Sequence, residues 1–241
     1  MNFTGSDSNA CLRALFPAQL FGLASVAGPS GEHALFAEEA AIVAGAVSKR
    51  RAEFAAGRHC ARAALGQLGR AGAPLLRLPD GAPDWPAGTV GSISHTEGCV
   101  VGVAALDTLV CAVGVDVEQQ GDTVPPGVLA LVCNDAERRW LAALPSDEAA
   151  GAVRALFSVK EAVVKCTSGL LGRRPVPSDI SIELDLACGV FRAMVGSAID
   201  RNSRFSPLSG RVAANGHHVF AAVWRLRQAH RTTFSAKACQ S

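Results

Sequence analysis

The pattern of apolar and polar positions divides the chain into helical and strand-like blocks that occur twice in the same order. Residues 1–31 contain Leu and Phe without a regular period, so we expect an irregular arm laid over the fold. The alanine-rich segment 32–47 begins with acidic residues, which favours a helix. Residues 48–68 predict a second helix, with Ser48 as its cap.

A loop and a group of strands follow this helical block. Residues 74–86 are rich in Pro and Gly, which predicts a loop or a short extended piece that carries Arg77. Short β-branched runs separated by turn signals then predict strands of an antiparallel or mixed sheet. These runs cover residues 90–94, 99–106 and 110–118.

The second half of the chain repeats this order. Two helical segments precede two strands and a hairpin, in which Asn215-Gly216 is typical of a turn with positive φ at both central residues. The segments are 135–144 and 151–168 for the helices, then 180–185, 190–195, 210–214 and 217–226 for the strands. Helices followed by strands, twice, predict an α+β fold of two similar halves. We place these halves at 1–118 and 119–228, with a flexible tail at 229–241.

Composition narrows the class of protein. The chain has 241 residues, of which 49% are hydrophobic and 18% charged, which is typical of a soluble globular protein. We expect no membrane span, because no run of about 18 bulky apolar residues occurs. The start lacks the pattern of a secretory signal, and the eight cysteines form no Cys-x-x-Cys pair, so we expect a cytoplasmic protein with reduced thiols. A net charge of +2 gives no general attraction to nucleic acid, so any anion site must come from local clustering.

Two carboxylates close the third predicted strand. Asp116 and Glu118 are separated by one residue, and alternate side chains of a strand share a face. They would therefore lie about 7 Å apart on one side, in an arrangement that suits a hard divalent cation such as Mg²⁺. The alternative is a solvated strand end, where Asp and Glu are ordinary residues.

A second group of charges lies inside the predicted helix 151–168. In FSVKEAVVK, Glu161 and Lys165 are four residues apart on one helix face, and Lys160 precedes Glu161. A surface ion pair would explain this spacing. The apolar neighbours favour instead a half-buried glutamate with two lysines nearby, which is typical of a site.

Ser94 and His95 end the strand in SISHTEG. A serine hydrolase would need a third acidic partner and a Gly-x-Ser-x-Gly turn, and the sequence around Ser94 has no such turn. The pair fits hydrogen bonding to phosphate better, although a histidine without function is also compatible with the sequence.

The helix 48–68 carries a run of basic residues. Arg50, Arg58 and Arg62 fall on one broad face, with Lys49 and Arg51 beside them and Arg77 in the loop that follows. A solvated basic face is the simple interpretation, and a small polyphosphate ligand is the functional one.

Together and in this order, the motifs resemble the 4′-phosphopantetheinyl transferases that serve nonribosomal peptide, polyketide and siderophore synthases. The similarity is to the enterobactin and surfactin synthetase branch of that family. It rests on KRRAEFAAGRHCARAAL at 49–65, WPAGTVGSISHTEG at 85–98, VGVDVE at 113–118 and FSVKEAVVK at 157–165.

The resemblance implies a monomer of two related α+β halves with coenzyme A bound in the cleft between them. Such an enzyme moves phosphopantetheine from coenzyme A to a serine of an acyl or peptidyl carrier protein and releases 3′,5′-ADP. Mg²⁺, with Mn²⁺ as a substitute, would be held by Asp116, Glu118 and Glu161. Coenzyme A would be held by Arg50, Arg58, Arg77, Ser94, His95, Lys160 and Lys165.

The resemblance also implies catalytic roles. Glu161 would accept the proton of the carrier serine, and Lys165 would neutralise charge on the leaving oxygens. Val164 stands where the family often has an aromatic residue, which leaves open what lines the path of the carrier serine or the pantetheine arm. The alternative from another class is a non-catalytic module that binds coenzyme A or a carrier protein through the basic helix.

Overall fold

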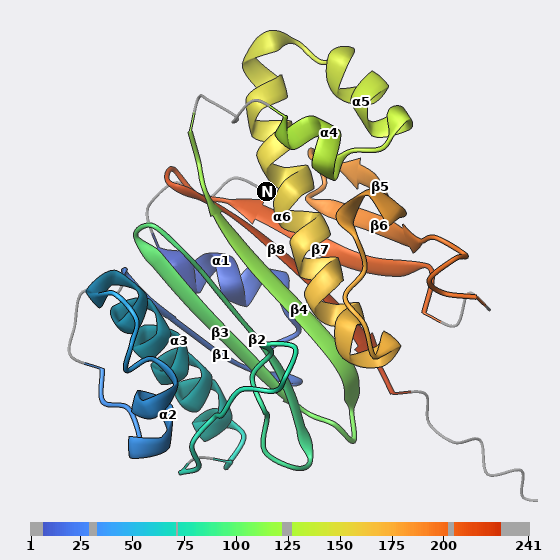
Figure 1. Cartoon of the computed structure of the whole chain (residues 1–241). Helices are drawn as coiled ribbons and strands as arrows, with labels where there is room; N and C mark the ends of the chain where they lie inside the picture. The colour runs from blue at the N-terminus through green and yellow to red at the C-terminus, as the bar shows by residue number, and fades with distance from the viewer. Residues whose placement is uncertain (1–6, 29–32, 71, 122–126, 202–204, 228–241) are drawn as a thin grey trace, which may run out of the picture.

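The computed structural model describes residues 7–28, 33–70, 72–121, 127–201 and 205–227. Within them, helices and strands form two antiparallel sheets, each with one long helix across a face (Figure 1). The α+β class and the repeated arrangement of a long helix on a sheet are therefore confirmed.

The first sheet has three strands in the order β1-β3-β2. These strands are β1 (Phe21–Val26), β2 (Thr89–Thr96) and β3 (Cys99–Leu106), and the long helix α3 (Ser48–Gln67) packs on them. Gly102 of β3 allows this packing, because a Cβ there would lie 2.7 Å from the backbone carbon of Cys60. The short helices α1 (Ser8–Leu15) and α2 (Ala37–Ile42) complete this part.

The second sheet has five strands in the order β4-β8-β7-β6-β5. The strands are β4 (Val110–Gln119), β5 (Ile180–Asp185), β6 (Val190–Val195), β7 (Leu208–Ala214) and β8 (His218–Leu226). Helix α6 (Ser146–Leu171) covers one face, with α4 (Val128–Val132) and α5 (Asp135–Ala142) beside it in Figure 1. A 3₁₀ turn, η1 (Pro177–Asp179), leads into β5.

Serine hydroxyls join the two sheets at β2 and β4. The Oγ of Ser92 accepts the N–H of Val115 at 3.1 Å, and the Oγ of Ser94 accepts that of Val117 at 3.4 Å. The odd-numbered valines of β4 enter one apolar core with β3, β8 and α1. Asp116 and Glu118 consequently project from the opposite face of β4, which is the face covered by α6.

The amino-terminal segment differs from the prediction of an irregular arm. Asp7 caps α1 by accepting the N–H groups of Asn9 and Ala10, and the apolar side of this helix enters the core. Strand β1 pairs with β3, from Phe21 opposite Ala105 onward, a partner far along the chain that local sequence does not reveal.

The two helices predicted next are both present, with corrections at their ends. The predicted helix 32–47 is only α2, six residues that begin at Ala37. The helix predicted at 48–68 is confirmed as α3, but Ser48 is its first helical residue and Val47 is the capping position, without a side-chain hydrogen bond. The prediction that Ser48 caps this helix was wrong.

The predicted hairpin is confirmed as β7 and β8, but its turn has a different geometry. Gly216 has no positive φ, and the Oδ1 of Asn215 accepts the N–H groups of His217 and His218 at 2.9 and 2.7 Å. The turn is therefore centred on Gly216 and His217 instead of Asn215 and Gly216, since the N–H of Asn215 donates to the carbonyl of His218 at 3.0 Å. The tail predicted at 229–241 lies outside the described residues.

Strand β4 lies at the predicted boundary between the two halves. Strand β4, which the sequence division places in the first half, hydrogen-bonds to β8 in the second sheet. The division at residue 118 stays a prediction.

Of the cysteines that the structure describes, all are free thiols and most are buried. Among the described residues, no helix combines the length and the apolar character needed to cross a membrane.

Candidate active site

Strand β4 and helix α6 approach each other closely beside Asp116. Gly114 makes this possible, because a Cβ at that position would lie 1.9 Å from the carbonyl oxygen of Ala162. The Nζ of Lys165, one helical turn after Glu161, reaches the Oδ1 of Asp116 at 2.7 Å. The VGVDVE motif thus brings a carboxylate of β4 against a lysine of α6.

Ser94 adds the first sheet to this contact. Its Oγ donates to the Oδ1 of Asp116 at 2.8 Å and accepts from the Nζ of Lys165 at 2.9 Å. Lys165 also donates to the carbonyl of Val115 at 3.2 Å. Three predicted site residues from β2, β4 and α6 therefore form one hydrogen-bonded group.

The carboxylates at the end of β4 keep capacity for a further ligand. The Oδ2 of Asp116 is buried and has no hydrogen-bond partner in the structure. Burial, and next the charge of Asp116, raise the pKa of Glu118 to about 7; Glu161 adds to the rise, while Lys165 and Arg154 oppose it. Burial is the largest cause of this rise in pKa, and the smaller contributions of Asp116 and Glu161 show that three carboxylates lie near one another, which favours binding of a cation.

Glu161 is held by a residue that the sequence reasoning missed. The guanidinium of Arg174, between α6 and η1, donates to the Oε2 of Glu161 at 2.9 Å. The side chain of Glu161 is 19% exposed and that of Arg174 is 68% exposed. The predicted half-buried glutamate is therefore present, with an arginine as its partner. An i, i+4 ion pair with Lys165 is not what the structure shows, since Lys165 bonds to Asp116.

Arg50 and His95 form a second group beside the first. The Nη1 of Arg50 lies 3.0 Å from the Nε2 of His95, and the same nitrogen is 3.5 Å from the Oε2 of Glu53. Burial lowers the pKa of His95, and the charges of Arg50 and Lys165 also lower it while that of Glu53 opposes them. Glu53 was not among the predicted residues, although it lies within the basic helix motif at 49–65.

The other basic residues of α3 have partners within the protein. The Nε of Arg58 donates to the carbonyl of Leu75 at 2.7 Å, and burial lowers the pKa of Arg58 to about 10. Arg62 forms an ion pair of 2.7 Å with the fully buried Glu39. Arg77 donates to the carbonyl of Gly81 at 3.1 Å in the predicted loop. Much of the basic face is thus neutralised or satisfied internally, and contacts of Arg58 and Arg77 with coenzyme A stay predictions.

Lys160 points away from the group around Asp116. Its side chain is fully buried, and its Nζ donates to the Oε2 of Glu137 at 2.6 Å and to the carbonyls of Val132 and Pro177. Glu137 in turn accepts the N–H of Ile182 on β5. Lys160 therefore ties α4, α5, η1 and β5 to α6, and its contact with coenzyme A stays a prediction.

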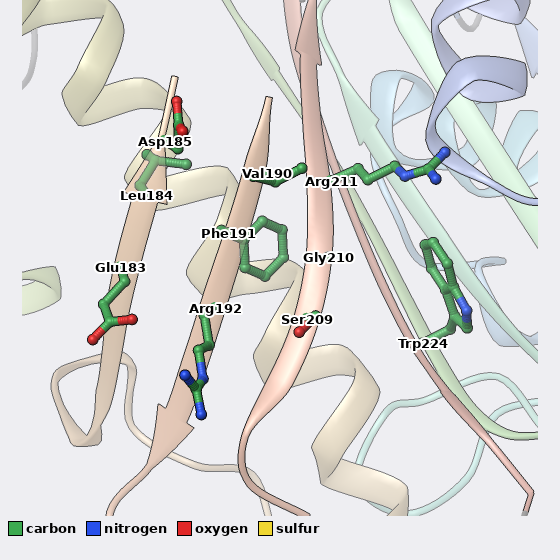
Figure 2. A pocket seen from close by; sticks show the side chains of 10 residues that line it. All are labelled: Glu183, Leu184, Asp185, Val190, Phe191, Arg192, Ser209, Gly210, Arg211 and Trp224. Atoms are coloured by element: carbon green, nitrogen blue, oxygen red, sulfur yellow. The ribbon is translucent and has the colours of Figure 1, made fainter. Parts of the chain in front are cut away.

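Figure 2 shows a groove in a different part of the molecule. It has a volume of about 530 Å³ and lies on strands β5 to β8, with Arg192, Arg211 and Trp224 among its lining residues. None of the predicted site residues lines it. The predicted cleft between the halves is not this groove. Among the described residues there is also no group of three or more His, Cys, Asp or Glu side chains arranged to hold a metal ion.

Comparison with known families identifies the class. Residues 38–105 match the 4′-phosphopantetheinyl transferase N-terminal domain, and residues 112–224 match the 4′-phosphopantetheinyl transferase superfamily. The chain therefore belongs to the 4′-phosphopantetheinyl transferases, a class of enzymes, as the motifs predicted.

Three relatives carry the same enzyme name. The chain is 41% identical over 192 residues to 4′-phosphopantetheinyl transferase Svp of Streptomyces mobaraensis, which is 78% of each chain. It is 44% identical over 133 residues to PptT of Mycobacterium tuberculosis, with 53% of this chain and 56% of the relative covered. It is 37% identical over 147 residues to Npt of Nocardia iowensis, with 61% of each covered.

Proposed function

We propose that this enzyme transfers the 4′-phosphopantetheine group of coenzyme A to a serine of a carrier protein and releases 3′,5′-ADP. The observation that carries the proposal is the contact of Lys165 with both Ser94 and Asp116, which joins β2, β4 and α6 at one point. Lys165, Arg50 and His95 can donate to the oxygens of a diphosphate, and the unpartnered oxygen of Asp116 can bind a divalent cation that accompanies it.

The residues at the end of β4 fit a hard divalent cation. Mg²⁺ takes one or two protein carboxylates and completes its shell with water and substrate phosphates, so a closed cage of protein ligands is not needed. The unpartnered Oδ2 of Asp116 and the crowding of negative charge around Glu118 support this assignment. Asp116, Glu118 and Glu161 would hold the ion. Bound there, it would stabilise negative charge on the diphosphate.

The side chains of the site would then act mainly by position and charge. The Nζ of Lys165 would exchange one of its three hydrogen bonds for an oxygen of the diphosphate, on the side where charge grows as 3′,5′-ADP departs. Glu161 would take the proton of the carrier serine, directly or through water. Arg50 and His95 would bind a phosphate group of coenzyme A farther from Lys165. Glu53 would hold Arg50 in position through their ion pair.

Two rival functions are less well supported. A serine hydrolase needs Ser94 activated by a histidine, whereas the Oγ of Ser94 is engaged by Asp116 and Lys165 and His95 faces Arg50. A non-catalytic module that binds coenzyme A or a carrier protein would not need carboxylates of β4 beside a lysine of α6. The names of the three relatives also favour transfer.

The test is the mass of an apo carrier protein incubated with the enzyme, coenzyme A and Mg²⁺. We expect a gain of one phosphopantetheine, and loss of about 100-fold or more in rate for Asp116→Ala and Glu161→Ala. Glu148→Ala, an exposed position on the same helix as Glu161, is the control and should keep the wild-type rate. Tight binding of coenzyme A without any mass gain on several carriers would support the binding module instead.

The remaining features belong to the same proposal. They are a monomeric state, a cytoplasmic location, acceptance of Mn²⁺ in place of Mg²⁺, and service to nonribosomal peptide, polyketide or siderophore synthases. The free and mostly buried thiols are compatible with a reducing compartment.

A further inference from the structure

Arg174 forms an ion pair with the carboxylate of Glu161, which is a ligand of the proposed metal site. Its Nη2 lies 2.9 Å from the Oε2 of Glu161, and it comes from the segment between α6 and η1, outside the motifs that resemble the family. Glu161 shares its helix face with Lys165, which is engaged with Asp116. Each of the two carboxylates, Asp116 and Glu161, is thus held by a cation of the protein.

The strength of this pair can be judged from burial. Arg174 is 68% exposed, and ion pairs that involve an exposed side chain contribute little to stability because solvent screens them. The pair of Arg62 with Glu39 is a contrast, because Glu39 is fully buried and Arg62 is 19% exposed. The Arg174–Glu161 pair is therefore weak enough to be exchanged for a stronger cation, and Arg174 is free to move into solvent.

The carboxylates of Asp116, Glu118 and Glu161 are not gathered around one point in the structure. Among the described residues, no three acidic, histidine or cysteine side chains are arranged to hold a metal ion. Glu161 is instead paired with Arg174 of the segment 172–176.

We propose that Arg174 is a positioning residue that competes with the divalent cation for Glu161. It holds Glu161 in place while the cation is absent and releases it when the cation binds. This inference rests on the proposed role of Glu161 as a metal ligand, so its test must separate the two ideas.

Arg173 is the matched control for Arg174. It has the same side chain and the neighbouring position, but its Nη2 donates to the carbonyl of Ala198 at 3.0 Å, and no contact with Glu161 is found in the structure. A substitution there removes the same charge from the same segment without touching the site.

The experiment is a titration of Mn²⁺ into the enzyme with saturating coenzyme A, followed by electron paramagnetic resonance of the free ion. We expect Arg174→Gln to bind Mn²⁺ roughly threefold to fivefold more tightly than wild type, since the loss of up to about 1 kcal/mol of competing ion pair corresponds to this factor. Arg173→Gln should bind as wild type does, and Glu161→Gln should bind at least tenfold more weakly. In the Glu161→Gln background, Arg174→Gln should have no further effect.

Three other outcomes of the Mn²⁺ titration would contradict the proposed role of Arg174. Weaker binding by Glu161→Gln with unchanged or weaker binding by Arg174→Gln overturns the role of Arg174 and leaves the metal role of Glu161 intact. Equal tightening by Arg173→Gln and Arg174→Gln shows a general charge effect and also overturns it. Unchanged binding by Glu161→Gln removes Glu161 from the metal site and the inference with it. Thermal unfolding of each variant confirms that it is folded.

Discussion

Glu118 shows how single side chains are tuned at the end of β4. Its pKa of about 7 lies well above its ordinary value of 4.5, mainly because of burial and the charge of Asp116. A metal-free protein therefore keeps a proton on Glu118 at pH values where the unfolded chain has lost it. A cation bound beside these carboxylates would favour the ionised form and reverse this effect.

The shift predicts a pH dependence of stability in the presence of a chelator. Between about pH 5 and pH 7 the folded state binds more protons at Glu118 than the unfolded state does, so the free energy of unfolding falls as the pH rises. Urea unfolding of wild type and Glu118→Gln at pH 5 and pH 7.5 measures this effect. We expect the variant to gain in stability relative to wild type at the higher pH, and a difference that is independent of pH would contradict the shift.

Local sequence indicated which residues belong to the candidate site, but it did not indicate their hydrogen-bond partners. The two-residue period of a strand placed Asp116 and Glu118 on one face, and the structure agrees. The partners of Arg58, Lys160 and Glu161 come from segments 13 to 28 residues away, and no short motif encodes them. The sequence did not indicate Arg174 as a site residue, because Arg174 lies outside every motif.

At the scale of elements, Gly114 determines how closely α6 approaches β4. A Cβ at this position would lie 1.9 Å from the carbonyl oxygen of Ala162 and 2.8 Å from the amide nitrogen of Cys166. Both atoms are backbone, so the helix itself would have to move. Lys165 is carried by the same turn of α6, and such a movement would separate it from Asp116.

Gly114→Ala should therefore weaken both stability and transfer. We expect a loss of about 1–3 kcal/mol in the free energy of unfolding, as is usual for overpacking, together with a lower rate of transfer. Gly151→Ala is the control, because a Cβ there meets nothing within 4 Å and alanine favours a helix by up to about 1 kcal/mol. Urea unfolding and the carrier mass assay test both variants, and wild-type behaviour of Gly114→Ala would show that close packing is not needed.

Some helices and strands could be predicted from the sequence, and others could not. Long periodic segments such as α3 and α6, and the β-branched runs, were found from sequence because burial of one face imposes the period. Strand β1 was missed because its stability comes from pairing with β3 and from the aromatic contact of Phe21 with Phe16. The turn at Asn215 differs from the expectation because the Oδ1 of Asn215 accepts backbone N–H groups and Gly216 has no positive φ.

At the scale of the whole molecule, the candidate site lies where the two sheets meet. Ser92 and Ser94 bridge β2 to β4, and Lys165 reaches across from the helix of the second sheet. The repeated order of helices and strands predicted two similar parts, but it did not show which strands would adjoin. That contact depends on buried hydroxyl groups that have no periodic signature.

The most direct test of this account is anomalous diffraction from crystals grown with coenzyme A and Mn²⁺. We expect one strong manganese peak beside Asp116, Glu118 and Glu161, together with the diphosphate of coenzyme A. A manganese peak elsewhere, or coenzyme A bound away from the junction of β2, β4 and α6, would contradict it.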